Sequence, residues 1–318
     1  MSSATAKPRC LLCGSDASEP VDALTPPELE QSWFHIGVKL SPSAMDLFKG
    51  LKRIELLRCR DCGFQFFTPV LPGNSAFYED LQRQIPGYYP ATGPAFARAL
   101  DTARTHGLQE VMDLGCGGGA FLDLAKAGGL LTHGLDLNAH AVEGCRERGH
   151  AVLNMTAEDF AATRPERHFP LVTAFEVLEH VPDPAAFFRE AAALVAPGGY
   201  LAIAVPNNEG AHRLCSLEPL QWPPHHLTRW RAADLRRLGE RNGLELASLE
   251  GDPLRGMQLR YYLRLQGELE HLLGRRKSRP GRLWPELVTF VYRVLLCRRY
   301  VRRGSSLHAL YRKPAGAA

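Results

Sequence analysis

The stretch VMDLGCGGG, residues 111–119, decides the fold. An apolar run carries Asp113 near its end, and four of the last five residues are glycine. A glycine-rich turn between a buried strand and a helix lets a ligand approach the backbone and its N–H groups. A dinucleotide-binding turn would read G-x-G-x-x-G, without a carboxylate at this place. Because a carboxylate repels a pyrophosphate and attracts an ammonium group, the stretch predicts a nucleoside cofactor that carries a cation.

Strand and helix patterns alternate from residue 108 onward. Strands are predicted at 110–114, 131–136, 150–154, 170–175, 199–205 and 244–251. Helices are predicted at 119–128, 138–148, 183–195 and 232–242. This alternation predicts an α/β fold, with a mostly parallel sheet and helices on both of its faces.

Acidic residues follow two of these predicted strands. Asp136 ends the second strand, about 20 positions beyond the glycines, where a carboxylate can accept hydrogen bonds from ribose hydroxyls. Glu158 and Asp159 follow the third strand, in a predicted loop that would cover an adenine. Since ligands bind at the carboxyl ends of parallel strands, these positions predict a nucleoside site.

Four segments in register carry a family resemblance: DLGCGGGAFL, GLDLN, FEVLEHVPDP (175–184) and LVAPGGYLAIAVPN (194–207). Together they resemble the S-adenosylmethionine-dependent methyltransferases of the Rossmann-like class, most of all the group with the ubiquinone-biosynthesis O-methyltransferases. The resemblance implies a seven-stranded sheet whose last strand is antiparallel. The segment SSLHALYRKP (305–314) resembles that last strand.

The resemblance also implies S-adenosyl-L-methionine as cofactor and a set of residues around it. These residues are Asp113, Gly115, Cys116, Gly117, Asp136, Leu137, Ala157, Glu158, Phe175 and Glu176. Asp113 and the glycine backbone would hold the methionine part, and Asp136 the ribose. Ala157 and Glu158 would contact the adenine.

Two CxxC pairs lie in the first 75 residues, Cys10 with Cys13 and Cys59 with Cys62. In a chain with no evident secretion signal, this pattern favours metal binding over disulfides, although two unrelated pairs are the alternative. Four thiolates predict a tetrahedral Zn²⁺ site, structural because no ligand position stays open. We therefore predict a zinc ribbon with a helical excursion over residues 1–75 and a methyltransferase domain over 76–318. The ribbon resembles the N-terminal domains of sugar C-methyltransferases.

Three histidines are candidates for proton transfer from an acceptor: His180 in LEHVP, and His225 and His226 in WPPHHLTRW. A sulfonium methyl group transfers in line to a nucleophile, so positioning contributes most of the catalysis. A hydroxyl or carbon acceptor additionally needs a base, and histidine is the usual one. The alternative is that these histidines only hydrogen-bond to the loop backbone.

The positive charge is concentrated near the end of the chain. Residues 255–318 hold fifteen Lys and Arg against three Asp and Glu, a net charge of +12. Residues 252–303 separate the last two strands as a basic insertion with two helical patterns. An insertion there can cap the acceptor pocket, pair two chains, or contact a membrane surface through residues 284–303. The sequence leaves the oligomeric state open.

The sequence predicts a cytoplasmic methyltransferase, since neither a signal peptide nor an apolar run of about 20 residues is evident. The favoured acceptor is a small or sugar-containing molecule, including an anionic one such as a nucleotide sugar. One alternative is an RNA base methyltransferase, less favoured because residues 1–75 lack a dense basic face. Another is an interaction protein that binds the cofactor without turnover.

Overall fold

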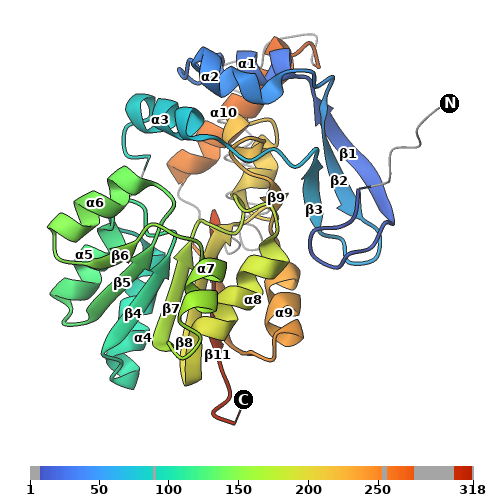
Figure 1. Ribbon diagram of the computed structural model, residues 1–318. Coiled ribbons are helices and arrows are strands. Elements are labelled where there is room, and N and C mark those ends of the chain that lie inside the picture. Colours follow the sequence, from blue (N-terminus) through green and yellow to red (C-terminus); the bar gives the residue numbers. More distant parts are fainter. Residues whose placement is uncertain (1–7, 89–90, 253–255, 276–303, 317–318) are drawn as a thin grey trace.

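The computed structural model describes residues 8–88, 91–252, 256–275 and 304–316. Its larger sheet is built from seven strands: β4 (Glu110–Leu114), β5 (Leu131–Leu135), β6 (Ala151–Leu153), β7 (Phe169–Phe175), β8 (Val195–Pro206), β10 (Glu245–Gly251) and β11 (Ser306–Arg312). They lie in the order β10-β11-β8-β7-β4-β5-β6 (Figure 1). Only β11 is antiparallel to its neighbours, β8 and β10. The predicted mostly parallel sheet with an antiparallel last strand is therefore confirmed.

Helices cover both faces of this sheet (Figure 1). One face carries α4 (Pro94–His106), α5 (Ala120–Ala127) and α6 (Ala139–Glu147). The other carries α7 (Ala157–Thr163), α8 (Pro184–Leu194) and α9 (Ala232–Arg241). The predicted helices at 119–128, 138–148, 183–195 and 232–242 are confirmed within two residues at each end.

The loop predicted around Glu158 and Asp159 is wrong, because both residues lie in the first turn of α7. Thr156 caps this helix, since its side chain accepts a hydrogen bond from the Asp159 N–H at 3.0 Å. Phe160 is buried on the inner side of the helix. A capping residue and one apolar anchor are enough for a two-turn helix, which is too short to show a clear period in sequence.

The N-terminal part forms a second sheet of four antiparallel strands. They are β1 (Ser18–Leu24), β2 (Ile54–Cys59), β3 (Gln65–Thr68) and β9 (Thr228–Arg229), in that order. The helical excursion between β1 and β2 contains α1 (Pro26–His35), α2 (Pro42–Met45) and the 3₁₀ turn η1 (Asp46–Phe48). Strand β9 comes from far along the chain and pairs with β3, so the two parts of the chain share this sheet.

The first predicted helix of the basic insertion is present as α10 (Gly256–Leu272). Its Leu265 and Leu269 are buried with Trp33 of α1 and Phe77 of α3 (Ser75–Gln84). The insertion therefore packs onto the N-terminal helices. Two 3₁₀ turns, η2 (Ala211–Cys215) and η3 (Pro219–Gln221), lie between β8 and β9.

The second helical pattern of the insertion, at 285–303, and the proposed membrane contact through 284–303 lie outside the described residues. Within the described part of the chain, none of the helices has the length and apolar character needed to span a membrane.

Candidate active site

The glycine turn joins β4 to α5 and is anchored to the end of β5. The N–H groups of Gly115 and Cys116 donate to the Leu135 carbonyl at 2.7 and 3.1 Å. Gly115 has a φ of +73°, and a Cβ there would lie 2.7 Å from a methyl carbon of Val177. A Cβ on Gly118 would meet nothing within 4 Å. The turn is therefore packed closely on one side and open on another, as a ligand cradle must be.

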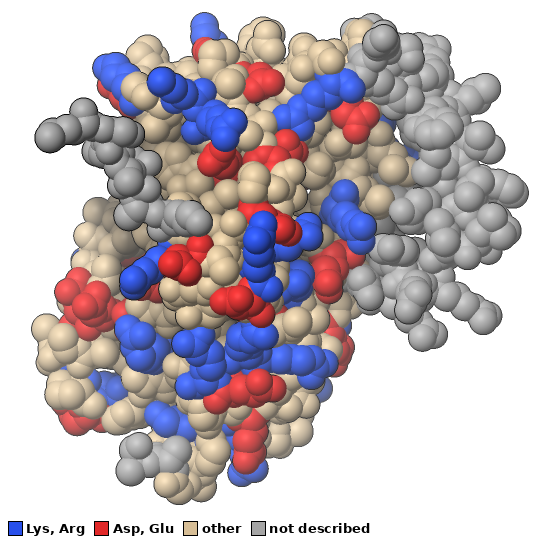
Figure 2. Space-filling model, turned by 90° about the vertical axis from the view of Figure 1, so that its right-hand side faces the viewer, with Lys and Arg blue, Asp and Glu red and all other residues tan. Residues whose placement is uncertain are grey.

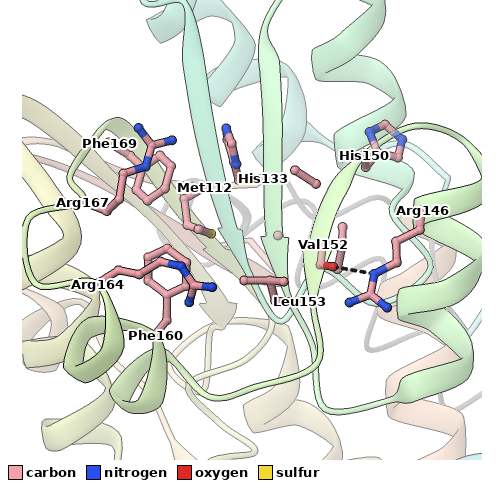
Figure 3. Close-up of a pocket in the computed structure, with 12 residues that line it drawn as sticks. Met112, His133, Arg146, His150, Val152, Leu153, Phe160, Arg164, Arg167 and Phe169 are labelled. Carbon is pink, nitrogen blue, oxygen red and sulfur yellow. Dashed lines mark hydrogen bonds between the residues drawn. The ribbon is translucent and has the colours of Figure 1, made fainter.

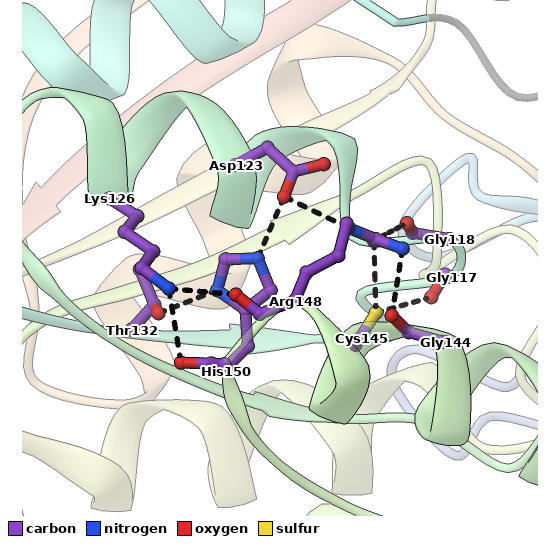
Figure 4. A network of polar contacts seen from close by, with 10 residues as sticks. Gly117, Gly118, Asp123, Lys126, Thr132, Gly144, Cys145, Arg148 and His150 are labelled. Carbon is purple, nitrogen blue, oxygen red and sulfur yellow. Dashed lines mark hydrogen bonds and ion pairs between the residues drawn. The ribbon is translucent and has the colours of Figure 1, made fainter.

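Side chains from α6 and the loop after it brace the glycine turn from behind (Figure 4). The Arg148 guanidinium donates to the Gly118 carbonyl and pairs with Asp123 at 3.1 Å. The Cys145 thiol donates to the Gly117 carbonyl at 3.6 Å. The network extends to Lys126, Thr132, Gly144 and His150. Sequence reasoning missed this brace, because its members lie on separate elements and form no motif.

Asp113 lies one residue before the end of β4 as a buried carboxylate, with 3% of its surface exposed. The Thr173 hydroxyl donates to its Oδ1 at 2.7 Å. Burial raises the pKa of Asp113 to about 7, against the lowering effect of Thr173, and the nearby charge of Asp136 raises it further. Since burying an unpaired carboxylate is costly, the site suits a ligand that brings a positive charge.

Asp136 lies at the neighbouring strand end, beside the glycine turn. Its Oδ2 accepts the Gly117 N–H at 2.7 Å and its Oδ1 accepts the Asn138 N–H at 2.8 Å. The next residue, Leu137, is 72% exposed. A carboxylate fixed by backbone donors next to an exposed apolar side chain fits a nucleoside, with a sugar on the carboxylate and a base on the leucine.

The other residues expected around the cofactor lie in mixed positions. Ala157 is buried and Glu158 is exposed at the start of α7. The Phe175 ring packs between Phe96 and Phe121, with ring centres 5.2 and 5.0 Å away. Phe175 therefore supports the α4 and α5 side of the site through its ring.

The loop after β7 lies against the glycine turn, because Val177 packs on Gly115, and the same loop carries two glutamates. Glu176 has a φ of +55°, and no other non-glycine residue in the described ranges has a positive φ. Glu179 is 1% exposed, and within the described part of the chain neither of its carboxylate oxygens has a hydrogen-bond partner. Burial and the adjacent Glu176 raise the pKa of Glu179 well above its usual value. Sequence reasoning missed Glu179.

The three predicted histidines come together into one cluster. Their nearest candidate ligand atoms lie within 4.8 Å of one another. The Nδ1–H of His180 donates to the His225 carbonyl at 2.6 Å, and the Nδ1–H of His225 donates to the Leu220 carbonyl at 2.8 Å. Since a carbonyl can only accept, Nε2 is the lone-pair nitrogen of both neutral rings.

Burial keeps this cluster neutral at pH 7. It lowers the pKa of His180 to about 4, and those of His225 and His226 well below 6.5. The Tyr88 hydroxyl, from the segment after α3, donates to Nε2 of His225 at 2.8 Å. The N-terminal part of the chain therefore reaches over the cluster at the carboxyl ends of the strands.

The four cysteines of the N-terminal part also come together. The Cys10 and Cys62 sulfurs are 3.6 Å apart, as are those of Cys13 and Cys59, and all four lie within 4.8 Å of one another. Thiolates at about 2.3 Å from a tetrahedral Zn²⁺ lie about 3.8 Å apart, so the donor set fits this ion. Gly63, after the second pair, has a φ of +75° that a tight knuckle needs.

A cavity of about 280 Å³ lies against one face of the sheet, where its lining includes Met112, Val152 and Phe169 (Figure 3). Its three arginines already have partners: Arg146 donates to the Val152 carbonyl, Arg164 lies over a phenylalanine ring, and Arg167 pairs with Glu110 at 2.6 Å. Because these guanidinium groups already have partners, this cavity is a poor site for either the nucleoside cofactor or an anionic acceptor.

Comparisons with known proteins agree with this geometry. A family model described as a methyltransferase domain matches residues 81–249. The ubiquinone biosynthesis O-methyltransferase of Thiobacillus denitrificans is 31% identical over 199 residues, which cover 58% of this chain and 85% of that relative. The enzyme of the same name from Neisseria meningitidis serogroup A is 33% identical over 161 residues, which cover 45% of this chain and 66% of that relative.

Solved structures include similar chains. A putative methyltransferase from Bacillus halodurans has 24% identity and a TM-score of 0.49, covering 70% of this chain and 100% of its own. A SAM-dependent methyltransferase from Archaeoglobus fulgidus has 18% identity and a TM-score of 0.48, covering 69% and 94%. By its family match and the relative of which it covers 85%, the chain belongs to the methyltransferase domain family and is a Rossmann-like S-adenosylmethionine-dependent methyltransferase.

Proposed function

We propose that this protein transfers a methyl group from S-adenosylmethionine to a hydroxyl group of a small-molecule acceptor. The observation that carries this proposal is the histidine cluster beside the glycine turn. Val177 packs on Gly115, and the Leu227 N–H donates to the Glu179 carbonyl at 2.7 Å. These contacts hold the loop of His225 and His226 against the loop that touches the turn.

S-adenosylmethionine supplies a sulfonium methyl group when bound. The Asp113 carboxylate would accept its ammonium group, and the Asp136 carboxylate its ribose hydroxyls. Leu137 would pack on the adenine, and Glu158 lies at the start of the adjoining helix. Each of these roles suits the burial and charge of the side chain concerned.

We assign the proton transfer to His225. Its Nδ1–H is held by the Leu220 carbonyl, so its Nε2 can accept a proton, and the Tyr88 hydroxyl now donates to that nitrogen. In the reaction the acceptor oxygen attacks the methyl carbon, the sulfonium C–S bond breaks as the C–O bond forms, and the hydroxyl proton passes to Nε2. The overlying N-terminal segment would further accelerate the reaction, because it positions the acceptor and excludes water from the site.

A sugar-containing acceptor, such as a nucleotide sugar, is our first choice of substrate. A buried positive charge near His226 supports an anionic acceptor: Arg229 is 8% exposed and its charge contributes to lowering the pKa of His226. Its guanidinium donates to the Ser216 carbonyl at 2.9 Å, and its Nε has no hydrogen-bond partner within the described residues. Phenolic acceptors are the second choice, since the relatives named above are called ubiquinone biosynthesis O-methyltransferases. We also propose that the four cysteines hold a structural zinc ion. The proposal further includes a domain boundary near residue 75 and a cytoplasmic location.

The RNA alternative gains no support from the face in Figure 2. There, Lys and Arg side chains lie among Asp and Glu side chains over the described residues. A phosphate-binding surface would instead concentrate positive charge.

The proposal is tested with S-adenosylmethionine labelled in the methyl group, incubated with the full chain and with nucleotide sugars, free sugars, phenols and RNA in separate reactions. We expect label in a small hydroxyl acceptor, and a loss of rate in His225→Ala with cofactor affinity retained. Label transferred only to RNA would replace this function by the alternative. Cofactor binding without transfer to any acceptor would favour an interaction protein.

A further inference from the structure

We propose that Tyr88 is a further catalytic residue, which relays the proton of the acceptor hydroxyl group to Nε2 of His225. The relay rests on the proposed function, in which His225 finally takes that proton. It gives the N-terminal part of the chain a role in the chemistry itself, beyond the cover that this part forms over the histidines.

The direction of the hydrogen bond between Tyr88 and His225 is fixed by the other nitrogen of the imidazole. Nδ1 of His225 lies 2.8 Å from the Leu220 carbonyl, and a carbonyl only accepts, so this nitrogen carries the proton. Nε2 therefore carries the lone pair, and the Tyr88 hydroxyl at 2.8 Å must donate to it. The last proton on the path to the base is thus already in place.

The rest of the His225 ring is enclosed, and only 7% of the residue is exposed. The His226 ring stacks on it with ring centres 4.5 Å apart, and the His180 ring meets it edge-on at 4.7 Å. Trp33 of α1 lies edge-on to it at 6.4 Å. Because both nitrogens have partners and the ring is covered, an acceptor hydroxyl group meets the hydroxyl of Tyr88 before it meets His225.

Tyr88 is more exposed than the histidine to which it donates. It is partly buried, and its backbone N–H donates to the Ile85 carbonyl at 3.2 Å in the turn after α3. Its ring meets the His225 ring edge-on, with centres 5.8 Å apart. A phenol oxygen can accept one hydrogen bond while its own hydrogen donates another. The Tyr88 hydroxyl can therefore bond to an acceptor hydroxyl group and to Nε2 of His225 together.

The proton transfers balance without a further reactant. The acceptor oxygen attacks the methyl carbon and passes its proton to the Tyr88 oxygen, while the original Tyr88 proton passes to Nε2 of His225. Tyr88 ends the step as a neutral phenol, and His225 gains a positive charge as the sulfonium C–S bond breaks and the sulfur loses one. Because the total charge of the buried site stays the same, no additional charge has to be created away from water.

A second tyrosine near the cluster is less suited to this relay. The Tyr78 hydroxyl lies 3.5 Å from Nδ1 of His180, at the limit of a hydrogen bond. That nitrogen donates its hydrogen to the His225 carbonyl at 2.6 Å, so it has no lone pair with which to take a proton. The relay therefore belongs to Tyr88 rather than to Tyr78.

The test follows single turnovers of the full chain with methyl-labelled S-adenosylmethionine, using uridine diphosphate glucose and catechol as acceptor probes. Tyr88→Phe removes only the hydroxyl, so we expect the rate to fall roughly 100-fold and the affinity for S-adenosylhomocysteine to stay unchanged. His225→Ala should lower the rate by a similar factor. The double variant should lower it no further than either single variant, because both residues act on one proton path.

A matched control is Tyr200→Phe, which removes another hydrogen bond between a tyrosine and a histidine. The Tyr200 hydroxyl, on β8, lies 3.3 Å from Nδ1 of His106 on α4. This variant should transfer the methyl group at the rate of the unmodified protein. A loss equal to that of Tyr88→Phe would show a general effect of removing a tyrosine hydroxyl and would overturn the relay.

A proton inventory of the unmodified protein separates a relay from a structural role, and it does not depend on the folding of a variant. Single-turnover rates in mixtures of light and heavy water should follow a curve, because more than one proton moves in the step. A straight line, or an undiminished rate in Tyr88→Phe, would overturn the relay while label in the probe left the proposed function intact. Label in neither probe would overturn the relay together with the function on which it rests.

Discussion

The affinity for the cofactor should depend on pH through Asp113. Burial raises the pKa of this carboxyl from 3.8 to about 7. A pKa difference of this size means that ionising Asp113 costs about 4 kcal/mol more free energy in the folded, cofactor-free protein than in the unfolded chain. Because the folded pKa is raised, the stability of the cofactor-free protein should fall as pH rises from about 4 to about 7, and level off above that.

A bound ammonium group favours the ionised carboxylate, so binding must release the proton from Asp113 below pH 7. With a pKa of about 7, the ionised fraction grows about 25-fold between pH 5.5 and pH 7.5, and the affinity should grow with it. Isothermal titration with S-adenosylhomocysteine, in buffers of different ionisation heat, measures both the affinity and the released proton.

Asp113→Asn keeps the shape of the side chain and cannot ionise, so its affinity should be low and independent of pH over this range. Thr173→Val removes the hydrogen bond that lowers the pKa of Asp113, so the rise in affinity should move to higher pH. A flat profile for the unmodified protein, or an equal slope for Asp113→Asn, would refute this reasoning.

The other predictions concern the brace, the zinc site and the glycine turn. Arg148→Gln should raise the dissociation constant of S-adenosylhomocysteine about tenfold, a loss of about 1.4 kcal/mol in binding free energy. Arg146→Gln, two positions earlier on α6, should leave the dissociation constant unchanged, and equal effects of the two variants in calorimetry would contradict the brace. Cys59→Ser should remove about one zinc ion per chain, measured by mass spectrometry, and should lower the melting temperature. Gly118→Ala should keep the melting temperature, whereas Gly119→Ala, with a φ of +76° and a sulfur 2.6 Å from the new Cβ, should lower it by several degrees.

Much of the fold could be predicted because its elements are defined by local patterns. Strands β4 and β7 are apolar runs, and α5 follows directly from the glycine turn. Strand β9 could not be predicted, since two residues carry no period and its partner β3 lies about 160 positions earlier in the chain. The packing of α10 on α1 could not be predicted either. The leucines of α10 show that this helix has an apolar side, but they do not show which distant helix covers that side.

By itself the sequence determined the glycine turn, the acidic strand ends and the two cysteine pairs, because each depends on residues a few positions apart. Only the tertiary structure decided which side chains share a site. His180 and His225 are separated by 45 positions and meet through a loop bond, and Glu179 lies beside them without a hydrogen-bond partner among the residues the structure describes. The physical reason is that burial and proximity belong to packing between distant segments, which no local spacing encodes.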